Sequence, residues 1–248
     1  MSSPGALAGK AVLVTGSARR VGAVIVRALH ACGANVVIHN RTSVSEAEEL
    51  RAALEAERTG SAVTLRADLS DVAAIAQLVD RATGAFGRLD VLVNNASTFF
   101  PTPVGKITES HWQDLVGSNL KAPLFLSQAA APHLRATRGL ILNLVDIHGL
   151  RPLKRHTVYS VAKAGLVMLT RSLARELGPE IRVNAIAPGP VLWPENEVDA
   201  GLKAEIIERT ALKRAGSPED VAQAAVFFAC HAPYVTGQIL AVDGGRSI

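Results

Sequence analysis

The stretch that decides the fold lies near the start of the chain: Lys10-Ala-Val-Leu-Val-Thr-Gly-Ser-Ala-Arg-Arg-Val-Gly22. The apolar run Lys10–Thr15 predicts a short buried strand, and Arg20–Ala31 predicts an amphipathic helix. Gly16 and Gly22 allow a tight turn and close packing of the helix on the strand, and the N-terminus of such a helix attracts a pyrophosphate. Two glycines alone are a weak signal, but their place between a strand and a helix predicts a dinucleotide-binding turn.

The same alternation of apolar runs and helix-length segments continues to the end of the chain. Further strands are expected at Asn35–His39, Ala62–Arg66, Leu89–Asn94, Leu140–Leu144, Ile181–Ile186 and Gln238–Val242. Helices are expected at Val44–Arg58, Asp71–Ala85, Glu109–Leu134, Thr157–Leu177 and Pro218–Cys230. Apolar strands separated by helices predict a parallel sheet covered on both faces. We therefore expect an α/β fold, a single Rossmann-type doubly wound domain over residues 1–248 with a central parallel sheet of about seven strands.

Composition narrows the class of protein. The chain has two cysteines, Cys32 and Cys230, which indicates a reducing compartment, and its start resembles no signal peptide. No apolar run approaches membrane-spanning length, so we expect a cytoplasmic protein without a membrane partner. The net charge is +4, but the basic residues are dispersed and aromatics make up 4%, which argues against nucleic-acid binding. The seven histidines show no ligand spacing, so no metal site is expected.

The residues after the second strand favour NADP(H) over NAD(H). NAD-binding proteins often place an acid there for the ribose hydroxyls, whereas this chain has Asn40-Arg41-Thr42-Ser43. Arg20 replaces the middle glycine of the usual fingerprint. Arg20 and Arg41 could hold a 2′-phosphate with charge-assisted hydrogen bonds, or could be solvated surface residues. Two cations and no acid at these places favour the phosphate.

Further cofactor contacts are expected where the third and fourth strands end. Asp68, followed by Leu69, could accept a hydrogen bond from adenine or could cap the next helix. Asn94-Asn95-Ala96 follows the fourth strand, and its pair of asparagines could contact backbone and ribose. The irregular stretches Ser97–Thr108 and Pro188–Ala200 also follow strand ends, where such sheets bind their ligands.

A candidate catalytic pair follows the fifth strand. Tyr159 and Lys163 share one face of the expected helix. A nearby cation favours the phenolate and is expected to lower the tyrosine pKa toward neutrality, which suits proton exchange with a carbonyl or imine. This spacing is common by chance, but here it follows a dinucleotide-binding half, with Asn119 in the preceding helix.

These features together resemble the short-chain dehydrogenase/reductase family along nearly the whole chain. The matching marks are Thr15–Gly22, Asn94-Asn95-Ala96, Asn119, Tyr159 with Lys163, Ala187-Pro188-Gly189-Pro190 and Asp243-Gly244-Gly245. The resemblance implies that Lys163 also holds the nicotinamide ribose and that Asn119 helps a water relay protons. It also implies a homotetramer built through the two long helices and the C-terminal strand region.

Three departures from the usual family pattern look like the pteridine reductases, which reduce pterins and folates with NADPH. Asp146 stands where most members have Ser, Ser97 stands where most have Gly, and Arg20 replaces a glycine. By this resemblance Phe99 stacks on the pterin against the nicotinamide, and Ser97 contacts cofactor and substrate. Asp146, Tyr159 and Lys163 would form the catalytic trio. Alternatively, Phe99 anchors its loop and Asp146 caps a helix.

The resulting site prediction has three parts. The catalytic residues are Asp146, Tyr159, Lys163 and Asn119. The cofactor-binding residues are Gly16, Arg20, Val21, Gly22, Asn40, Arg41, Ser43, Asp68, Leu69, Asn95, Ala96, Ser97, Tyr159, Lys163, Pro188 and Gly189. The substrate-binding residues are Ser97, Phe99, Asp146, Tyr159 and Trp193, although Trp193 could instead pin its loop. Val191, where several pteridine reductases have Ser, leaves the particular pterin open.

Two other functions compete with pterin reduction. Reduction of a 3-oxoacyl or other carbonyl substrate predicts Ser at the position of Asp146 and no aromatic at Phe99. An NADPH-binding scaffold would be expected to lose Tyr159 or Lys163. The basic lip Arg151–His156 is expected to be exposed near the mouth of the site. It is either a solvated loop or subunit contact, or it meets an anionic substrate tail such as the glutamate of dihydrofolate.

Overall fold

The computed structural model describes residues 5–191 and 200–248. Its centre is a parallel sheet of seven strands in the order β3-β2-β1-β4-β5-β6-β7. The strands are β1 (Ala11–Val14), β2 (Asn35–Asn40), β3 (Ala62–Arg66), β4 (Val91–Asn94), β5 (Leu140–Leu144), β6 (Arg182–Pro188) and β7 (Ile239–Val242). All the expected strands are present, with ends shifted by at most two residues. The predicted doubly wound fold is confirmed.

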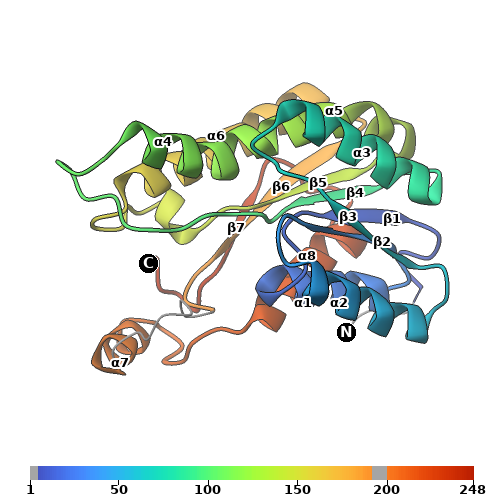
Figure 1. Cartoon of the computed structure of the whole chain (residues 1–248). Coiled ribbons are helices and arrows are strands. Elements are labelled where there is room, and N and C mark those ends of the chain that lie inside the picture. The colour runs from blue at the N-terminus through green and yellow to red at the C-terminus, as the bar shows by residue number, and fades with distance from the viewer. Residues whose placement is uncertain (1–4, 192–199) are drawn as a thin grey trace.

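Helices cover both faces of the sheet (Figure 1). One face carries α1 (Arg20–Ala31), α2 (Val44–Glu57) and α8 (Pro218–Cys230). The other carries α3 (Val72–Phe86), α4 (Glu109–Val116), α5 (Ala122–Thr137) and α6 (Thr157–Leu177). No helix among residues 5–191 and 200–248 combines the length and apolarity needed to cross a membrane.

Burial on both faces explains why the strands are continuous apolar runs. In β1, Val12 and Val14 belong to the core under α1, α2 and α8, whereas Leu13 belongs to the core under α3, α5 and α6. All three side chains are fully buried. A strand with one face in solvent would alternate apolar and polar residues instead, so the two-layered core is what the run at the start of the chain encodes.

Two helical features differ from the sequence expectation. The helix expected over Glu109–Leu134 is interrupted by a π-helical turn, Gly117–Lys121, which contains Asn119. Such turns are rare and are frequent at functional sites. Helix α7 (Ala200–Glu208) was not expected at all, and it stands away from the sheet (Figure 1). Its sequence gave no signal because it has no apolar stripe to pack on the core.

The topology places a ligand crevice between β1 and β4. The chain runs from β1 outward to β2 and β3, then returns to the other side of β1 as β4. The carboxyl ends of these two strands are therefore adjacent, and the connections that follow them diverge to opposite faces. Open α/β sheets bind ligands at this switch point. Gly16 follows β1 there, and Asn95 follows β4.

Candidate active site

The glycine turn after β1 depends on the absence of side chains. Gly16 has φ +60°, and a Cβ built on it would lie 2.9 Å from Cα of Ala96. A Cβ on Gly22 would lie 2.6 Å from Nδ2 of Asn95. Real Cβ atoms do not approach so closely, so both predicted glycines are required by the packing of this turn.

Asn95 ties the ends of β1 and β4 together. Its Nδ2 donates to the carbonyls of Thr15 and Gly16, at 2.8 and 2.9 Å. The Thr15 hydroxyl accepts from the backbone N–H groups of Asn95 and Ala96, at 3.0 and 3.1 Å. The expected contact of Asn95 with backbone is thus present, while its contact with a ribose remains a prediction.

Arg20 has a left-handed backbone conformation, which explains why a glycine is usual at this position of the dinucleotide fingerprint. Its φ is +57°, in the left-handed region, at the first residue of α1. A non-glycine residue there costs about 1–2 kcal/mol, and such strain is retained mainly at functional sites. The Arg20 side chain is exposed, and Val21 beside it is half-buried. An exposed cation at this helix N-terminus fits an anionic dinucleotide.

The end of β2 offers further groups for a nucleotide. Asn40 is 4% exposed, and within the described residues its Oδ1 has no hydrogen-bond partner. Buried acceptors are usually bonded, so this atom fits a ligand contact. Arg41 is exposed beside it, and Ser43 precedes α2 without using its hydroxyl as a cap. Arg41, the Ser43 hydroxyl and Arg20 fit an anionic group such as a 2′-phosphate, whereas Asn40 Oδ1 is an acceptor and fits a ligand group that donates.

Asp68 does not cap α3, so that alternative is excluded. The cap is Asp71, whose Oδ1 accepts from the N–H of Ala73 at 2.8 Å. Asp68 is exposed and accepts from the N–H of Ser70 at 2.9 Å. Hydrogen bonds from Ser70, and secondarily the charge of Arg41, lower the pKa of Asp68. Leu69 is buried next to it. A contact of either residue with adenine remains a prediction.

Pro188 and Gly189 lie at the end of β6, next to the end of β7. The N–H of Gly189 donates to the carbonyl of Val242 at 3.0 Å, and a Cβ on Gly189 would lie 2.6 Å from Cβ of Asp243. This close approach fits the expected loop. The predicted substrate residue Trp193 lies outside the described residues.

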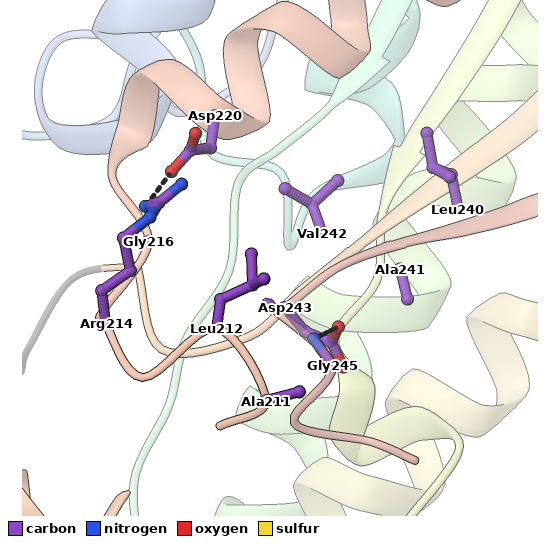
Figure 2. Close-up of a pocket in the computed structure, with 11 residues that line it drawn as sticks. Ala211, Leu212, Arg214, Gly216, Asp220, Leu240, Ala241, Val242, Asp243 and Gly245 are labelled. Atoms are coloured by element: carbon purple, nitrogen blue, oxygen red, sulfur yellow. Dashed lines mark hydrogen bonds and ion pairs between the residues drawn. The ribbon is translucent and has the colours of Figure 1, made fainter. Parts of the chain in front are cut away.

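A cavity of about 440 Å³ opens beyond this loop, between the segment 211–216 and the end of β7 (Figure 2). Arg214 and Asp220 form an ion pair at its rim, at 3.2 Å. Asp243 bonds the N–H groups of Gly245 and Ser247, at 2.9 and 2.8 Å. Among the described residues none of the predicted site residues lines this cavity, so it is separate from the catalytic groups.

Asp146 joins Tyr159 directly. The phenol donates to Oδ2 of Asp146 at 2.8 Å. Oδ1 of the same carboxylate accepts from the N–H of His148 at 2.8 Å and caps a short 3₁₀ turn, Ile147–Gly149. One oxygen of Asp146 therefore caps the turn, as one alternative expected, and the other bonds the phenol. The catalytic part of Asp146 remains a prediction.

Lys163 lies beneath the phenol and is buried. Its Nζ donates to the carbonyl of Leu144 at 2.8 Å and lies 5.7 Å from the ring centre of Tyr159. Burial lowers the Lys163 pKa to about 8, although the charge of Asp146 acts in the opposite direction. The ammonium is therefore still mostly protonated at neutral pH.

The expectation that Lys163 lowers the tyrosine pKa was wrong. The pKa of Tyr159 is raised well above its usual value, first by burial and then by the charge and hydrogen bond of Asp146. Ser97, beside the phenol, acts in the lowering direction but more weakly. Burial and an adjacent carboxylate both disfavour a phenolate, and the expectation for this pKa took only the charge of Lys163 into account. In this structure Tyr159 is a neutral phenol.

Ser97 connects this centre to Asn119. The Ser97 hydroxyl donates to Oδ1 of Asn119 at 2.6 Å. Nδ2 of Asn119 donates to the carbonyls of Thr98 and Leu115, both at 2.9 Å. The π-helical turn thus places the buried Asn119 where it fixes the start of the loop Ser97–Thr108.

Phe99 forms a wall beside the phenol together with His156. The two rings stack at 4.6 Å with an interplanar angle of 9°, and Phe99 meets Tyr159 edge-on at 4.8 Å. Phe99 is still 46% exposed. The sequence predicted a role for Phe99 but not its contact with His156. His156 belongs to the basic segment Arg151–His156, and the sequence does not show that it is half-buried while Arg155 is exposed.

The basic lip is exposed and tied to the same loop. Arg151, Lys154 and Arg155 are exposed, as expected. The N–H of Thr102 donates to the carbonyl of Arg155 at 2.6 Å, so the lip runs beside the loop that carries Phe99. Within residues 5–191 and 200–248 no group of acidic, histidine or cysteine side chains has a metal-binding arrangement.

Comparison with known proteins finds relatives over nearly the whole chain. The family model described as "Enoyl-(Acyl carrier protein) reductase" matches residues 16–247. A putative ketoacyl reductase of the granaticin polyketide synthase, from Streptomyces violaceoruber, is 39% identical and covers 95% of both chains. Pteridine reductase 1 of Leishmania tarentolae is 37% identical, covering 95% of this chain and 96% of its own.

A solved structure agrees with the fold and with the kind of cofactor. The blue fluorescent protein from a metagenomic library, in complex with NADPH, superposes with a TM-score of 0.92 at 35% identity. The match covers 98% of this chain and 99% of that protein.

Proposed function

Because the chain belongs to the short-chain dehydrogenase/reductase family, we propose that it is an NADPH-dependent reductase that converts dihydropterins or dihydrofolate to their tetrahydro forms. NADPH is the cofactor that fits the exposed cations Arg20 and Arg41. The single observation that carries the choice of substrate is the 2.8 Å hydrogen bond between Tyr159 and Asp146.

The raised pKa of Tyr159 suits reduction of a ring C=N bond. NADPH, when bound, supplies a hydride to the carbon of that bond. The adjacent nitrogen then needs a proton, and Tyr159 holds one at neutral pH because its pKa lies well above 10. Asp146, bonded to the same phenol, can take up a proton from water and return it to Tyr159. A serine at position 146 would offer no carboxylate oxygen for this exchange.

Lys163 and Ser97 support this proton transfer. The Lys163 ammonium, held by the carbonyl of Leu144, compensates the negative charge that forms on Tyr159 when the phenol gives up its proton. Ser97 donates to Asn119, so the lone pairs of its hydroxyl remain available to accept from the pterin ring or its amino group. We assign Ser97 a contact with both cofactor and substrate on this basis.

Phe99 provides a surface for a flat substrate. His156 covers one face of its ring, and Tyr159 meets its edge. A pterin stacked on the remaining face would lie beside the phenol that protonates it, since the two rings are 4.8 Å apart. Stacked aromatic pairs are favourable beyond the area that they bury.

Reduction of a 3-oxoacyl substrate is the second candidate. It is favoured by the ketoacyl reductase among the relatives, which is as similar to this chain as the pteridine reductase. Asp146 and Phe99 argue against it, because that reaction is expected with Ser at position 146 and needs no stacking surface.

A substrate panel tests the proposal. NADPH oxidation would be followed with oxidised pterins, dihydropterins, dihydrofolate and acyl ketones at equal concentrations. We expect the highest kcat/KM for a dihydropterin or dihydrofolate. A higher kcat/KM for acyl ketones would contradict the pterin assignment and support the second candidate.

We also propose that the protein is a homotetramer. Val161 and Met168 on α6 are 50% and 60% exposed, Leu124 on α5 is 38% exposed, and Leu240 on the edge strand β7 is 39% exposed. Apolar side chains gathered on two long helices and a sheet edge fit interfaces between identical chains. Light scattering after size exclusion measures the mass directly. A mass equal to one chain would contradict this proposal.

A further inference from the structure

His39, the residue of β2 next to Asn40, contacts the glycine turn through its side chain. Its Nδ1 accepts from the N–H of Gly16 at 2.9 Å. Its Nε2 lies 3.2 Å from the carbonyl oxygen of Ala67, after β3. The imidazole therefore bridges the connections that follow β1 and β3, at the carboxyl end of the sheet.

These two partners fix the protonation state of the ring. A backbone N–H can only donate and a carbonyl can only accept, so Nδ1 must be unprotonated and Nε2 must carry the proton. In a charged imidazole Nδ1 would also carry a proton, and two donors, Nδ1–H and the N–H of Gly16, would then face each other. His39 is 2% exposed, and burial lowers its pKa to about 4, while Asp68, the charged residue acting on it, raises the pKa slightly. The ring therefore stays neutral throughout the physiological pH range.

The main chain of His39 holds the same turn. Its carbonyl accepts from the N–H of Ser17 at 2.9 Å, and its N–H donates to the Ser17 hydroxyl at 3.2 Å. On the other side of this turn, Nδ2 of Asn95 donates to the carbonyl of Gly16 at 2.9 Å. The N–H of Gly16 thus donates to His39 and its carbonyl accepts from Asn95, and these two side chains fix the orientation of the turn.

We infer that His39 is a positioning residue of the dinucleotide site, which holds the Gly16 turn in the shape that receives the cofactor pyrophosphate. This inference rests on the proposed use of NADPH. The clamp acts on the turn and not on the 2′-phosphate, so its loss should weaken NADPH and NADH binding by the same factor. Arg20 and Arg41 should instead change the ratio between the two cofactors.

Two isosteric substitutions separate the hydrogen bonds. In His39→Asn the amide oxygen takes the place of Nδ1 and keeps the acceptor for Gly16. In His39→Gln the amide nitrogen takes the place of Nε2 and keeps the donor for Ala67, but the Gly16 N–H loses its acceptor. We expect dissociation constants for NADPH, measured by fluorescence titration, to rise less than about threefold in His39→Asn and about tenfold or more in His39→Gln and His39→Leu.

His30→Leu is the matched control. His30 is also buried, and it bonds Ser61 at 2.8 Å far from the turn, so its loss should lower the melting temperature without changing the dissociation constant for NADPH. If His39→Leu does not fold, the comparison of His39→Asn with His39→Gln decides. Equal NADPH affinity in those two variants, or an altered NADPH-to-NADH ratio, overturns the inference alone. A wild-type chain that binds neither dinucleotide overturns the proposed cofactor as well.

Discussion

The phenol of Tyr159, on α6, donates a 2.8 Å hydrogen bond to the carboxylate of Asp146, which follows β5. The carboxylate also bonds the N–H of His148, so its orientation is fixed from both sides. This pairing keeps the phenol protonated, since it disfavours a second negative charge at the same place. A neutral Tyr159 is prepared to give a proton, which suits reduction better than oxidation.

The first prediction separates the two functions of Asp146. Tyr159→Phe should lower kcat by roughly 10²-fold or more while NADPH binding is nearly unchanged, because proton transfer alone is removed. Asp146→Asn keeps an acceptor for the His148 N–H and should fold normally, yet it should lose pterin reduction because an amide cannot relay a proton. Asp146→Ser should be impaired in the same way. Steady-state kinetics with a dihydropterin measure all three, and full activity in both Asp146 variants would contradict the pterin assignment.

The second prediction concerns alkaline pH. Burial lowers the pKa of Lys163 to about 8, so its charge and the bond it is proposed to make with the nicotinamide ribose weaken as pH rises through that value. NADPH affinity should therefore fall above about pH 8. Between about pH 8 and pH 10.4 the unfolded chain still binds a proton at this lysine, whereas the folded chain has lost it. The lysine's contribution to the free energy of unfolding therefore rises with pH in this window.

Tyr159→Phe is the control for this pH dependence. Because the pKa of Tyr159 lies well above 10, removing its hydroxyl should leave the alkaline loss of NADPH affinity in place. Titrations of both proteins with NADPH between about pH 6 and pH 9.5 make the comparison. If the loss disappeared in Tyr159→Phe, the titrating group would be the phenol and the present account of Lys163 would be wrong.

The fold could be predicted from the sequence because burial on both faces turns each strand into an uninterrupted apolar run. Leu13, for example, is fully buried in the core under α3, α5 and α6, while its neighbours in β1 are buried on the other face. Helix α7 could not be predicted, because it leaves the core and carries no apolar stripe. The π-helical turn at Asn119 was not predicted either, because it is a local change of backbone hydrogen bonding between two helical segments.

The site was partly predictable for a different reason. Tyr159, Lys163 and Asp146 could be found by their spacing and family resemblance, and the structure brings Asp146 and Tyr159 together. Their electrostatics could not be found, because a pKa depends on burial and on distances that the sequence does not contain. His156 against Phe99 and His39 against Gly16 are likewise contacts between strand ends and loops, fixed by tertiary packing alone.

The third prediction uses the left-handed backbone of Arg20. Arg20→Gly relieves the strain at φ +57° and should leave the free energy of unfolding within about 1 kcal/mol of wild type. It should still weaken the preference for NADPH, which we expect to be at least tenfold in the wild type because each charge-assisted bond contributes about 1.5–3 kcal/mol before screening. Arg41→Ala should weaken the preference similarly. The ratio of kcat/KM for NADPH and NADH measures it.

Arg27→Gly is the matched control for Arg20→Gly. Arg27 is exposed within α1, where the backbone is helical, so glycine there should cost about 1 kcal/mol of stability and leave the cofactor ratio unchanged. Equal use of NADPH and NADH by the wild type, or an Arg41→Ala variant that loses nothing, would show that these arginines do not contact a 2′-phosphate.

The fourth prediction concerns the stacking surface. Phe99→Ala should raise KM for dihydropterins several-fold with little change in NADPH affinity, because a stacked aromatic pair contributes about 0.5–1.5 kcal/mol beyond buried area. His156→Ala should have a smaller effect in the same direction, since it removes the support behind Phe99. Phe227→Ala is the control: its ring is 42% exposed and meets Phe228 at 5.4 Å on α8, so it should leave KM unchanged. An unchanged KM in Phe99→Ala would leave Phe99 as a loop anchor.

The last prediction tests whether the basic lip, Arg151–His156, contacts an anionic substrate tail. Lys154 and Arg155 are exposed, and the bond from Thr102 to Arg155 holds the lip beside the Phe99 loop. A pterin stacked on Phe99 would therefore carry any tail past these cations. Dihydrofolate has a glutamate tail and dihydrobiopterin does not. Attraction between exposed charges is screened beyond roughly 8–10 Å at physiological salt, so the two substrates should differ in their response to salt.

Raising the salt from a low level to about 0.5 M should raise KM for dihydrofolate more than KM for dihydrobiopterin, at saturating NADPH in both series. Neutralising Lys154 and Arg155 together should remove this difference. Neutralising Arg81 and Arg135, which are exposed on α3 and in the last turn of α5 at the opposite end of the sheet, should not. The comparison between substrates cancels any effect of salt on cofactor binding, because NADPH is common to both. If both substrates respond alike in the wild type, the lip does not recognise the glutamate, and its cations are surface charges without a part in substrate choice.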